Sequence, residues 1–374
     1  MSGVDPSAAV AKQTKLAAEI FDELYNKTFD GVGVTRASYG EGEQVASELL
    51  ESHAKKLGLV IDHDAAGNIY MTMRGESQEA PPIVIGSHID SVAQGGNFDG
   101  AAGVISGLIA CAGIIEKGIR LPQDIRVMGI RAEESAWFGV SYIGSRSALG
   151  TLPKDALDNA KRSDTGITLG EHMFKAGCNP DALRAGDIYL PPSSLKAYLE
   201  VHIEQGPVLD SKDLPLGIVT GIRGNRRLPS AQCIGEYSHC GGVPRSYRKD
   251  AVLAVTDLIS YLDKIWDECE RKGEDFAFTV GKFFTDKEWH AMTKISGAVE
   301  FSLDMRSLDG DFIETMTKRV CEEAVKIEQK RSVQFNLGDF TRAAPGPMDE
   351  HIKTRMLSGA CLLYTSPSPR DKTV

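Results

Sequence analysis

The chain has 374 residues, with 42 basic and 52 acidic side chains and a formal net charge of −10. This acidic balance, without a basic stripe, argues against nucleic acid or an anionic membrane as the main partner. No segment approaches the roughly 20 consecutive apolar residues of a membrane span, the first twelve residues carry no secretion signal, and the seven cysteines are scattered without a Cys-x-x-Cys pair. We therefore expect a soluble, cytoplasmic, enzyme-sized protein.

The first half of the chain alternates helical and strand patterns. Apolar residues at helical spacing predict helices over 8–26, 43–57 and 100–117, with shorter ones over 154–161 and 169–176. Apolar runs bounded by turn residues predict strands over 59–61, 69–73, 83–85, 124–131 and 195–202. This order predicts an α/β fold with a mixed, largely parallel sheet flanked by helices.

The pattern changes after residue 212. Strands are predicted over 217–224, 232–237, 276–285 and 299–305, and helices over 250–272 and 311–329. Four strands with two helices form an α+β unit of the size of an inserted domain. We therefore expect one domain made of residues 1–212 and 328–360, and an inserted domain over 213–327.

Ionisable residues gather where the predicted strands of the first domain end. They are His88, Asp90, Asp99, Glu133, Glu134 and His202. Each alone has an ordinary explanation, such as a helix cap for Asp99 or a solvated surface pair for the two glutamates. Together they contain the two His, Asp and Glu that a zinc site uses, and a carboxylate shared by two ions makes such a site binuclear. Glu133, beside a ligating Glu134, is then placed to accept a proton from activated water.

Several segments resemble the M20 metallohydrolase family, in its branch of N-carbamoyl-L-amino acid hydrolases, allantoate amidohydrolases and β-ureidopropionases. The most specific are Gly86-Ser-His-Ile-Asp90, Phe98-Asp-Gly-Ala-Ala-Gly103, His202-Ile-Glu-Gln-Gly-Pro207, His239-x-Gly-x-x-Pro244 and Phe301-Ser-Leu-Asp-Met-Arg306. The resemblance covers nearly the whole chain up to about residue 360. It implies hydrolysis of a linear C–N bond in a carbamoyl, ureido or acyl amino acid, and it makes the inserted domain a dimerisation and lid domain of a homodimer.

The resemblance also implies a pair of divalent metal ions, zinc or manganese. Asp99 would bridge the two ions, His88 and His202 would complete one site, and Glu134 would hold the other. Asp90 would hold the ligands in place without binding a metal ion itself.

The remaining roles implied by the resemblance concern the reaction and the substrate, a small molecule with a carboxylate. Glu133 would be the general base, and His239 would stabilise the oxyanion, reaching the active site of the partner subunit. Arg306 would bind the substrate carboxylate, a task that suits a bidentate guanidinium. Gln205 and Thr293 would be further substrate contacts.

The chain departs from the family pattern at several positions around the expected pocket. Thr293 stands where the family has an asparagine that helps to hold the substrate carboxylate, and Trp137 and Arg245 are also unusual. These changes would reshape the substrate pocket rather than change the reaction.

A further departure lies at the carboxyl end. The family's last metal ligand is a histidine in a Ser-Gly-Ala-Gly-His-Asp segment, but here residues 358–360 are followed by Cys361 and a tail over 361–374. This tail resembles the translation of a sequencing adapter, so we expect it to be non-native. Two alternatives remain: an aminoacylase or peptidase of the same superfamily, and a catalytically impaired binding protein, because the last ligand is missing.

Overall fold

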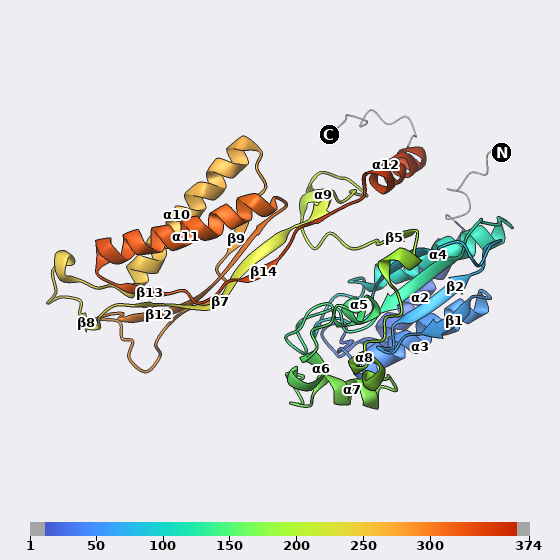
Figure 1. The fold of residues 1–374 in the computed structure, drawn as a ribbon, viewed down its shortest axis with the longest axis horizontal. Helices are drawn as coiled ribbons and strands as arrows, with labels where there is room; N and C mark the ends of the chain where they lie inside the picture. The colour runs from blue at the N-terminus through green and yellow to red at the C-terminus, as the bar shows by residue number, and fades with distance from the viewer. Residues whose placement is uncertain (1–11, 365–374) are drawn as a thin grey trace. The chain divides into compact units, whose positions relative to one another are not determined.

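The computed structural model describes residues 12–364, which form two compact units (Figure 1). The first unit ends at Pro215 and the second extends from Leu216 to Leu362. Each has its own sheet and its own buried core. The first residues of the helix predicted over 8–26, and residues 365–374 of the predicted tail, lie outside the described part.

The first unit alternates helices and strands. Its elements are α2 (Thr14–Thr28), α3 (Glu41–Lys56), β1 (Val60–His63), β2 (Ile69–Met73), β3 (Ile83–His88), α4 (Ala101–Glu116), β4 (Ile125–Ile130), α5 (Ile143–Ala148), α6 (Ala156–Asn159), α7 (Leu169–Lys175), α8 (Pro180–Arg184), β5 (Ala197–Leu199) and α9 (Val208–Ser211). Most predicted elements lie within a few residues of these. The strand predicted over 195–202 is wrong in extent, because only Ala197–Leu199 pairs with β3 and the chain then leaves the sheet.

The sheet of the first unit has five described strands in the order β1-β2-β4-β3-β5. The β1–β2 and β2–β4 pairs are antiparallel, whereas β3 runs parallel to both β4 and β5. The sheet is therefore mixed, as predicted, but not largely parallel. The antiparallel β1–β2 pair follows from the short Ala65-Ala-Gly-Asn68 turn, which can join only antiparallel neighbours.

Alternating side chains of the strands bury both faces of this sheet. Ile69 and Met71 of β2 pack in one core with α2, α3 and α4, while Tyr70 lies in a separate cluster with Val84 and Met128. This period of two is the strand geometry expected for a sheet covered on both sides. It leaves the carboxyl ends of β3 and β4 as a shared edge at which polar residues can gather.

The described part of the second unit contains two long helices, a six-stranded sheet and two two-stranded sheets. Its elements are β6 (Gly221–Ile222), β7 (Gly224–Ile234), β8 (Ser238–His239), α10 (Ala251–Lys272), β9 (Ala277–Thr279), β10 (Phe283–Thr285), β11 (Lys294–Ile295), β12 (Ala298–Ser307), α11 (Gly310–Arg331), β13 (Gln334–Asn336), β14 (Thr341–Ala343), β15 (Gly346–Pro347) and α12 (Glu350–Tyr364). α10 and α11 bury Leu258, Leu262 and Val320 against β7 and β12.

The strands predicted over 217–224 and 232–237 are wrong in extent, because the single strand β7 fills the interval between them. It is one strand of 11 residues that runs through Pro229 and pairs with β12. The register shifts between Phe301 and Leu303, so that Pro229 and Ser230 lie opposite Ser302 alone. A bulge leaves one residue out of the ladder, which explains how a proline without an N–H is tolerated inside a strand. The strand predicted over 276–285 is likewise split into β9 and β10 opposite this bulge.

The segment after α11 belongs to the second unit, which differs from the predicted domain boundary. Residues 328–360 were expected in the first domain, but β13 and β14 both pair with β7. Because β7 is longer than its neighbours, it has ladder positions for both short strands. In the described part of the chain, no helix is long and apolar enough to cross a membrane.

Candidate metal centre

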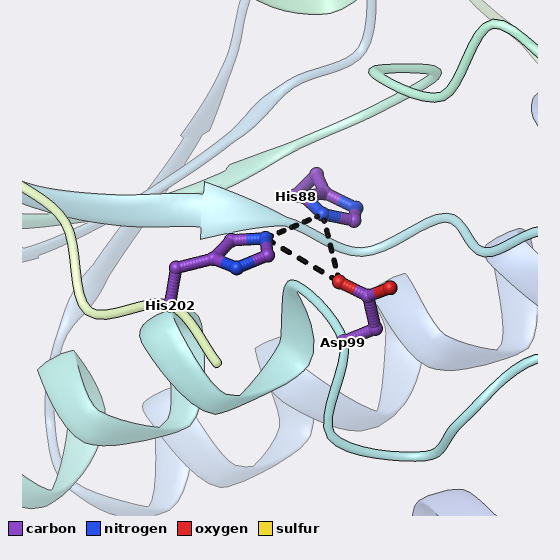
Figure 2. Close-up of side chains that lie close together, drawn as sticks. All are labelled: His88, Asp99 and His202. Atoms are coloured by element: carbon purple, nitrogen blue, oxygen red, sulfur yellow. Dashed lines mark hydrogen bonds and ion pairs between the residues drawn. The ribbon is translucent and has the colours of Figure 1, made fainter. Parts of the chain in front are cut away.

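Three predicted ligands come together at the carboxyl edge of the first sheet. His88 ends β3, Asp99 immediately precedes the turn into α4, and His202 follows β5 (Figure 2). The two Nε2 atoms lie 3.2 Å apart, and they lie 3.6 Å (His88) and 3.3 Å (His202) from Asp99 Oδ1. Parallel pairing of β3 with β5 brings together two histidines that are 114 residues apart.

Hydrogen bonds fix the orientation of both imidazole rings. His88 Nδ1 donates to the carbonyl of Asp90 at 3.0 Å, and His202 Nδ1 donates to the carbonyl of Ile203 at 2.8 Å. Each Nε2 therefore faces the other and Asp99 Oδ1 as an acceptor. Three hydrogen-bond acceptors at this distance repel one another unless a positive charge lies between them. That charge is either a proton or a metal cation.

The charges around the cluster favour a cation. Burial by itself would lower the pKa of His88, but hydrogen bonds with the carboxylates of Asp90 and Asp99 raise it to about 10. The hydrogen bond with His88 lowers the pKa of Asp99, although partial burial opposes this shift. Two imidazole nitrogens and one carboxylate oxygen are also the donor set of many divalent-metal sites. The residues present therefore fit a divalent ion.

Gly100 lets the loop that carries Asp99 (the ligand loop) approach β3 closely. It is the residue before α4 and has a φ of +66°, a conformation that glycine adopts without strain. A Cβ atom at this position would lie 2.5 Å from the ring and the carbonyl of His88. Only glycine therefore allows Asp99 to stand beside His88.

Arg36 joins the end of β3, which carries His88, to the loop that carries Asp99. Its side chain is fully buried, and it donates from Nε to the carbonyl of Ile89 at 2.7 Å and from a terminal nitrogen to the carbonyl of Asp99 at 3.1 Å. Burial lowers the pKa of Arg36 to about 10, and the carboxylates of Asp90 and Asp99 partly offset this effect.

Asp90 uses both carboxylate oxygens to hold the backbone of the neighbouring strand end. Oδ1 accepts the amide of Glu133 at 2.9 Å, and Oδ2 accepts the amide of Glu134 at 3.0 Å and the hydroxyl of Ser38 at 2.8 Å. Its oxygen Oδ1 also lies 3.5 Å from His88 Nδ1. Asp90 thus contacts both the histidine and the Glu133–Glu134 segment.

The two glutamates have different surroundings. The hydroxyl of Ser145 donates to Glu133 at 2.6 Å, and its amide donates at 3.2 Å. Burial raises the pKa of Glu133 to about 7, although these hydrogen bonds oppose the shift. A carboxyl that titrates near neutral pH suits proton transfer. Partial burial also raises the pKa of Glu134, which is not part of the three-residue cluster.

The predicted substrate contacts are divided between the two units. Gln205 lies beside the cluster and donates from Nε2 to both oxygens of Asp99, at 3.2 and 3.1 Å. His239, Thr293 and Arg306 lie in the second unit. There β8 pairs with β11, the amide of Cys240 donates to the carbonyl of Thr293, and Arg306 forms an ion pair with Asp304 at 2.9 Å.

Three supporting residues had no predicted role. The contacts of Arg36 and Ser145 depend on loops and on the short helix α5, so no local pattern indicates them. Glu43 carried a signal that was missed: it shares a helix face with Ala46, Leu50 and Ala54, all buried. A glutamate on the apolar stripe of a helix indicates a buried partner.

The chain is similar to several known amidohydrolases. The N-carbamoyl-L-amino acid amidohydrolase of Geobacillus stearothermophilus is 36% identical over 321 residues, which cover 86% of this chain and 76% of that protein. A hydantoinase/carbamoylase family amidase from Burkholderia multivorans has a similar structure, with a TM-score of 0.83 and 26% identity over 92% of this chain and 81% of that chain. This chain belongs to the hydantoinase/carbamoylase family of amidohydrolases.

Other matches agree with the family assignment. The allantoate amidohydrolase of Bacillus subtilis is 28% identical, over 88% of this chain and 77% of that protein. The profile of Peptidase family M28 matches residues 68–167, a range that includes His88, Asp99 and Glu133. The predicted carbamoylase branch is thereby confirmed, and with it a hydrolase acting on non-peptide C–N bonds.

Proposed function

We propose that this amidohydrolase is a metal-dependent enzyme that cleaves the linear C–N bond of an N-carbamoyl or ureido amino acid. The observation that carries the proposal is the convergence of His88, Asp99 and His202 at one sheet edge. The names of the relatives support the carbamoyl or ureido substrate class. The six described cysteines are all free thiols, which supports a cytoplasmic enzyme.

The metal would be held first by His88, Asp99 and His202. We propose a second ion, with Asp99 shared and Glu134 as a further ligand; zinc and manganese both suit nitrogen and carboxylate donors. A divalent ion at this position supplies a Lewis acid that acidifies water and polarises the scissile carbonyl.

Glu133 would carry the proton during the reaction. Its carboxylate accepts a proton from the attacking water and passes it to the leaving nitrogen as the C–N bond breaks. Ser145 holds this carboxylate through two hydrogen bonds, so the base keeps one orientation.

The second unit would be the dimerisation and lid domain. Arg306 would bind the substrate carboxylate, with Gln205 and Thr293 as further contacts, and His239 would stabilise the oxyanion from the partner subunit. Asp304 supports the role proposed for Arg306, because it accepts two hydrogen bonds from the guanidinium and so holds it in one orientation.

The test is hydrolysis of N-carbamoyl amino acids, ureido acids, N-acyl amino acids and dipeptides by metal-loaded protein. We expect turnover of the first two classes, loss of turnover with a chelator, and recovery when zinc or manganese is restored. Glu133→Gln should lower kcat by roughly 10²–10⁴-fold and keep the bound metal. Glu116→Gln, an exposed glutamate of the same unit, is the control.

Two outcomes would contradict the proposal. Turnover of N-acyl amino acids or dipeptides alone would identify an aminoacylase or peptidase. Metal-loaded protein that binds these compounds without hydrolysing any of them would identify a binding protein.

A further inference from the structure

Three successive backbone amides at the end of β4 are each accepted by a buried carboxylate. Glu43 Oε1 accepts the amide of Ala132 at 2.8 Å, and the two oxygens of Asp90 accept the amides of Glu133 and Glu134. The carbonyls are held as well: Ile143 donates to the carbonyl of Ala132, and Tyr142 to that of Glu133. The backbone that carries Glu133 is therefore fixed on both sides.

Glu43 lies on helix α3, far from Glu133 in sequence, and its side chain is fully buried. Its second oxygen, Oε2, accepts the amide of Tyr39 at 2.7 Å and Nε of Arg131 at 2.8 Å. A terminal nitrogen of Arg131 lies 2.7 Å from the same oxygen. The two oxygens thus have different partners: Oε2 accepts from Tyr39 and Arg131, and Oε1 accepts the amide of Ala132.

Ala132 needs this support because of its backbone conformation. It has a φ of +52°, in the left-handed region that is strained for a residue with a Cβ. Such a conformation persists when its surroundings determine it. The turn that it makes directs Glu133 toward Ser145 on α5.

We infer that Glu43 is a positioning residue for Glu133: through the amide of Ala132 it fixes the turn that aims the general base. This inference rests on the proposed role of Glu133. A purely structural role for Glu43 would stabilise α3 against β4 without affecting the reaction.

Glu43→Gln separates the two roles. An amide has one accepting oxygen, and the stronger demand is at Oε2, where Arg131 and Tyr39 donate; the NH₂ group is then left facing the amide of Ala132. We expect kcat to fall by about 10²-fold, with KM and metal content unchanged. Glu43→Asp keeps the charge and two acceptors, set back by one methylene, and should recover part of the loss.

Asp124→Asn is the matched control. Asp124 is also a buried carboxylate that pairs with an arginine and accepts an amide, from Arg74 and Gly75, but it lies at the opposite end of β3 and β4. Its substitution should lower the melting temperature without lowering kcat. Hydrogen exchange at the amides of 132–134 is a second readout, and it should accelerate in Glu43→Gln but not in Asp124→Asn.

The outcomes are distinguishable. An unchanged kcat in Glu43→Gln, or a loss of kcat matched by Asp124→Asn, would overturn the inference. If Glu43→Gln does not fold, Glu43→Asp decides: faster exchange at 132–134 together with a wild-type kcat would overturn the inference. If Glu133→Gln retains turnover, the proposed function fails instead, and exchange at 132–134 still reports whether Glu43 fixes this turn.

Discussion

Three carboxylates at one sheet edge behave differently because their neighbours differ. Asp99 has its pKa lowered by the hydrogen bond with His88, whereas burial raises the pKa of Glu133 to about 7. Asp90 is fully buried and spends both oxygens on the amides of Glu133 and Glu134. These surroundings suit the roles proposed for Asp99 as a ligand and for Glu133 as a proton acceptor, while Asp90 anchors the backbone. Pairs of acids with pKa values pushed apart are typical of hydrolytic sites.

Gly100→Ala tests how closely the ligand loop must approach β3. The new Cβ would lie 2.5 Å from the ring of His88, so the imidazole has to move away from Asp99. We expect the affinity for a divalent ion, measured by competition with a coloured chelator, to fall by roughly 10–100-fold, as for other changes that disturb ligand orientation.

The control for this prediction is Gly118→Ala. Gly118 has a similar φ of +62°, but a Cβ there has nothing within 4 Å. It therefore adds comparable backbone strain without the contact. Equal metal affinities in the two variants would contradict the prediction.

At the scale of elements, β12 separates two predicted substrate contacts. Arg306 lies near the carboxyl end of this strand, and β11, which pairs with the strand of His239, precedes its amino end. The eight steps from Ala298 to Arg306 span roughly 26 Å at about 3.3 Å per residue. This is much longer than a carbamoyl amino acid, so His239 and Arg306 of one chain cannot both contact one such substrate.

Mixing two inactive variants tests the consequence. If His239 acts from the partner subunit, His239→Ala and Arg306→Ala homodimers are both inactive, but a mixed dimer contains one site with both side chains intact. Unfolding and refolding the two together should restore about a quarter of the wild-type activity, since half of the dimers are mixed and half of their sites are complete. No recovery beyond that of the separate variants would exclude the shared site.

The same scale shows what the sequence could predict. Long amphipathic helices such as α10 and α11, and the runs that end at His88 and Glu133, follow from local apolar patterns. The α5 helix was missed because it has six residues and follows Tyr142, which is in a left-handed conformation and provides no capping side chain. The β7 strand was broken wrongly because Pro229 is tolerated only through a bulge that depends on β12.

The sequence predicted the residues of the three-residue cluster but not the contacts that support the site. The ligand cluster follows from strand ends that carry His and Asp, which is a local signal. The holding of Glu133 by Ser145, and of Ala132 by Glu43, joins residues through tertiary contacts across 12 and 89 positions of the chain. Such contacts have no local pattern, so they become visible only in the folded structure.

At the scale of the molecule, the two units have separate cores. The cluster around Leu258 and Val320 contains only residues of the second unit, and the clusters around Leu50, Leu169 and Tyr70 contain only residues of the first. The proposed metal ligands of the first unit contribute nothing to the second core. Unfolding of the two units is therefore expected to respond separately to ligands.

Calorimetry with and without a divalent ion tests this independence. We expect two transitions, of which only one moves to higher temperature on metal addition, because binding stabilises the folded unit that holds the ligands. His88→Ala should abolish that shift. Leu303→Ala, which opens a cavity in the other core, should lower only the second transition. One transition that moves as a whole would contradict the prediction.

The short β5 strand has a consequence for how long an ion stays bound. β5 is the last strand in the order of its sheet and pairs with β3 through only three residues, and such a strand is among the first to fray. His202 lies three residues beyond it, so fraying would carry this histidine away from His88 and Asp99 while the rest of the sheet stays folded. A bound ion would act as a crosslink between residues 114 positions apart. The rate at which β5 frays would then set the rate at which the ion dissociates.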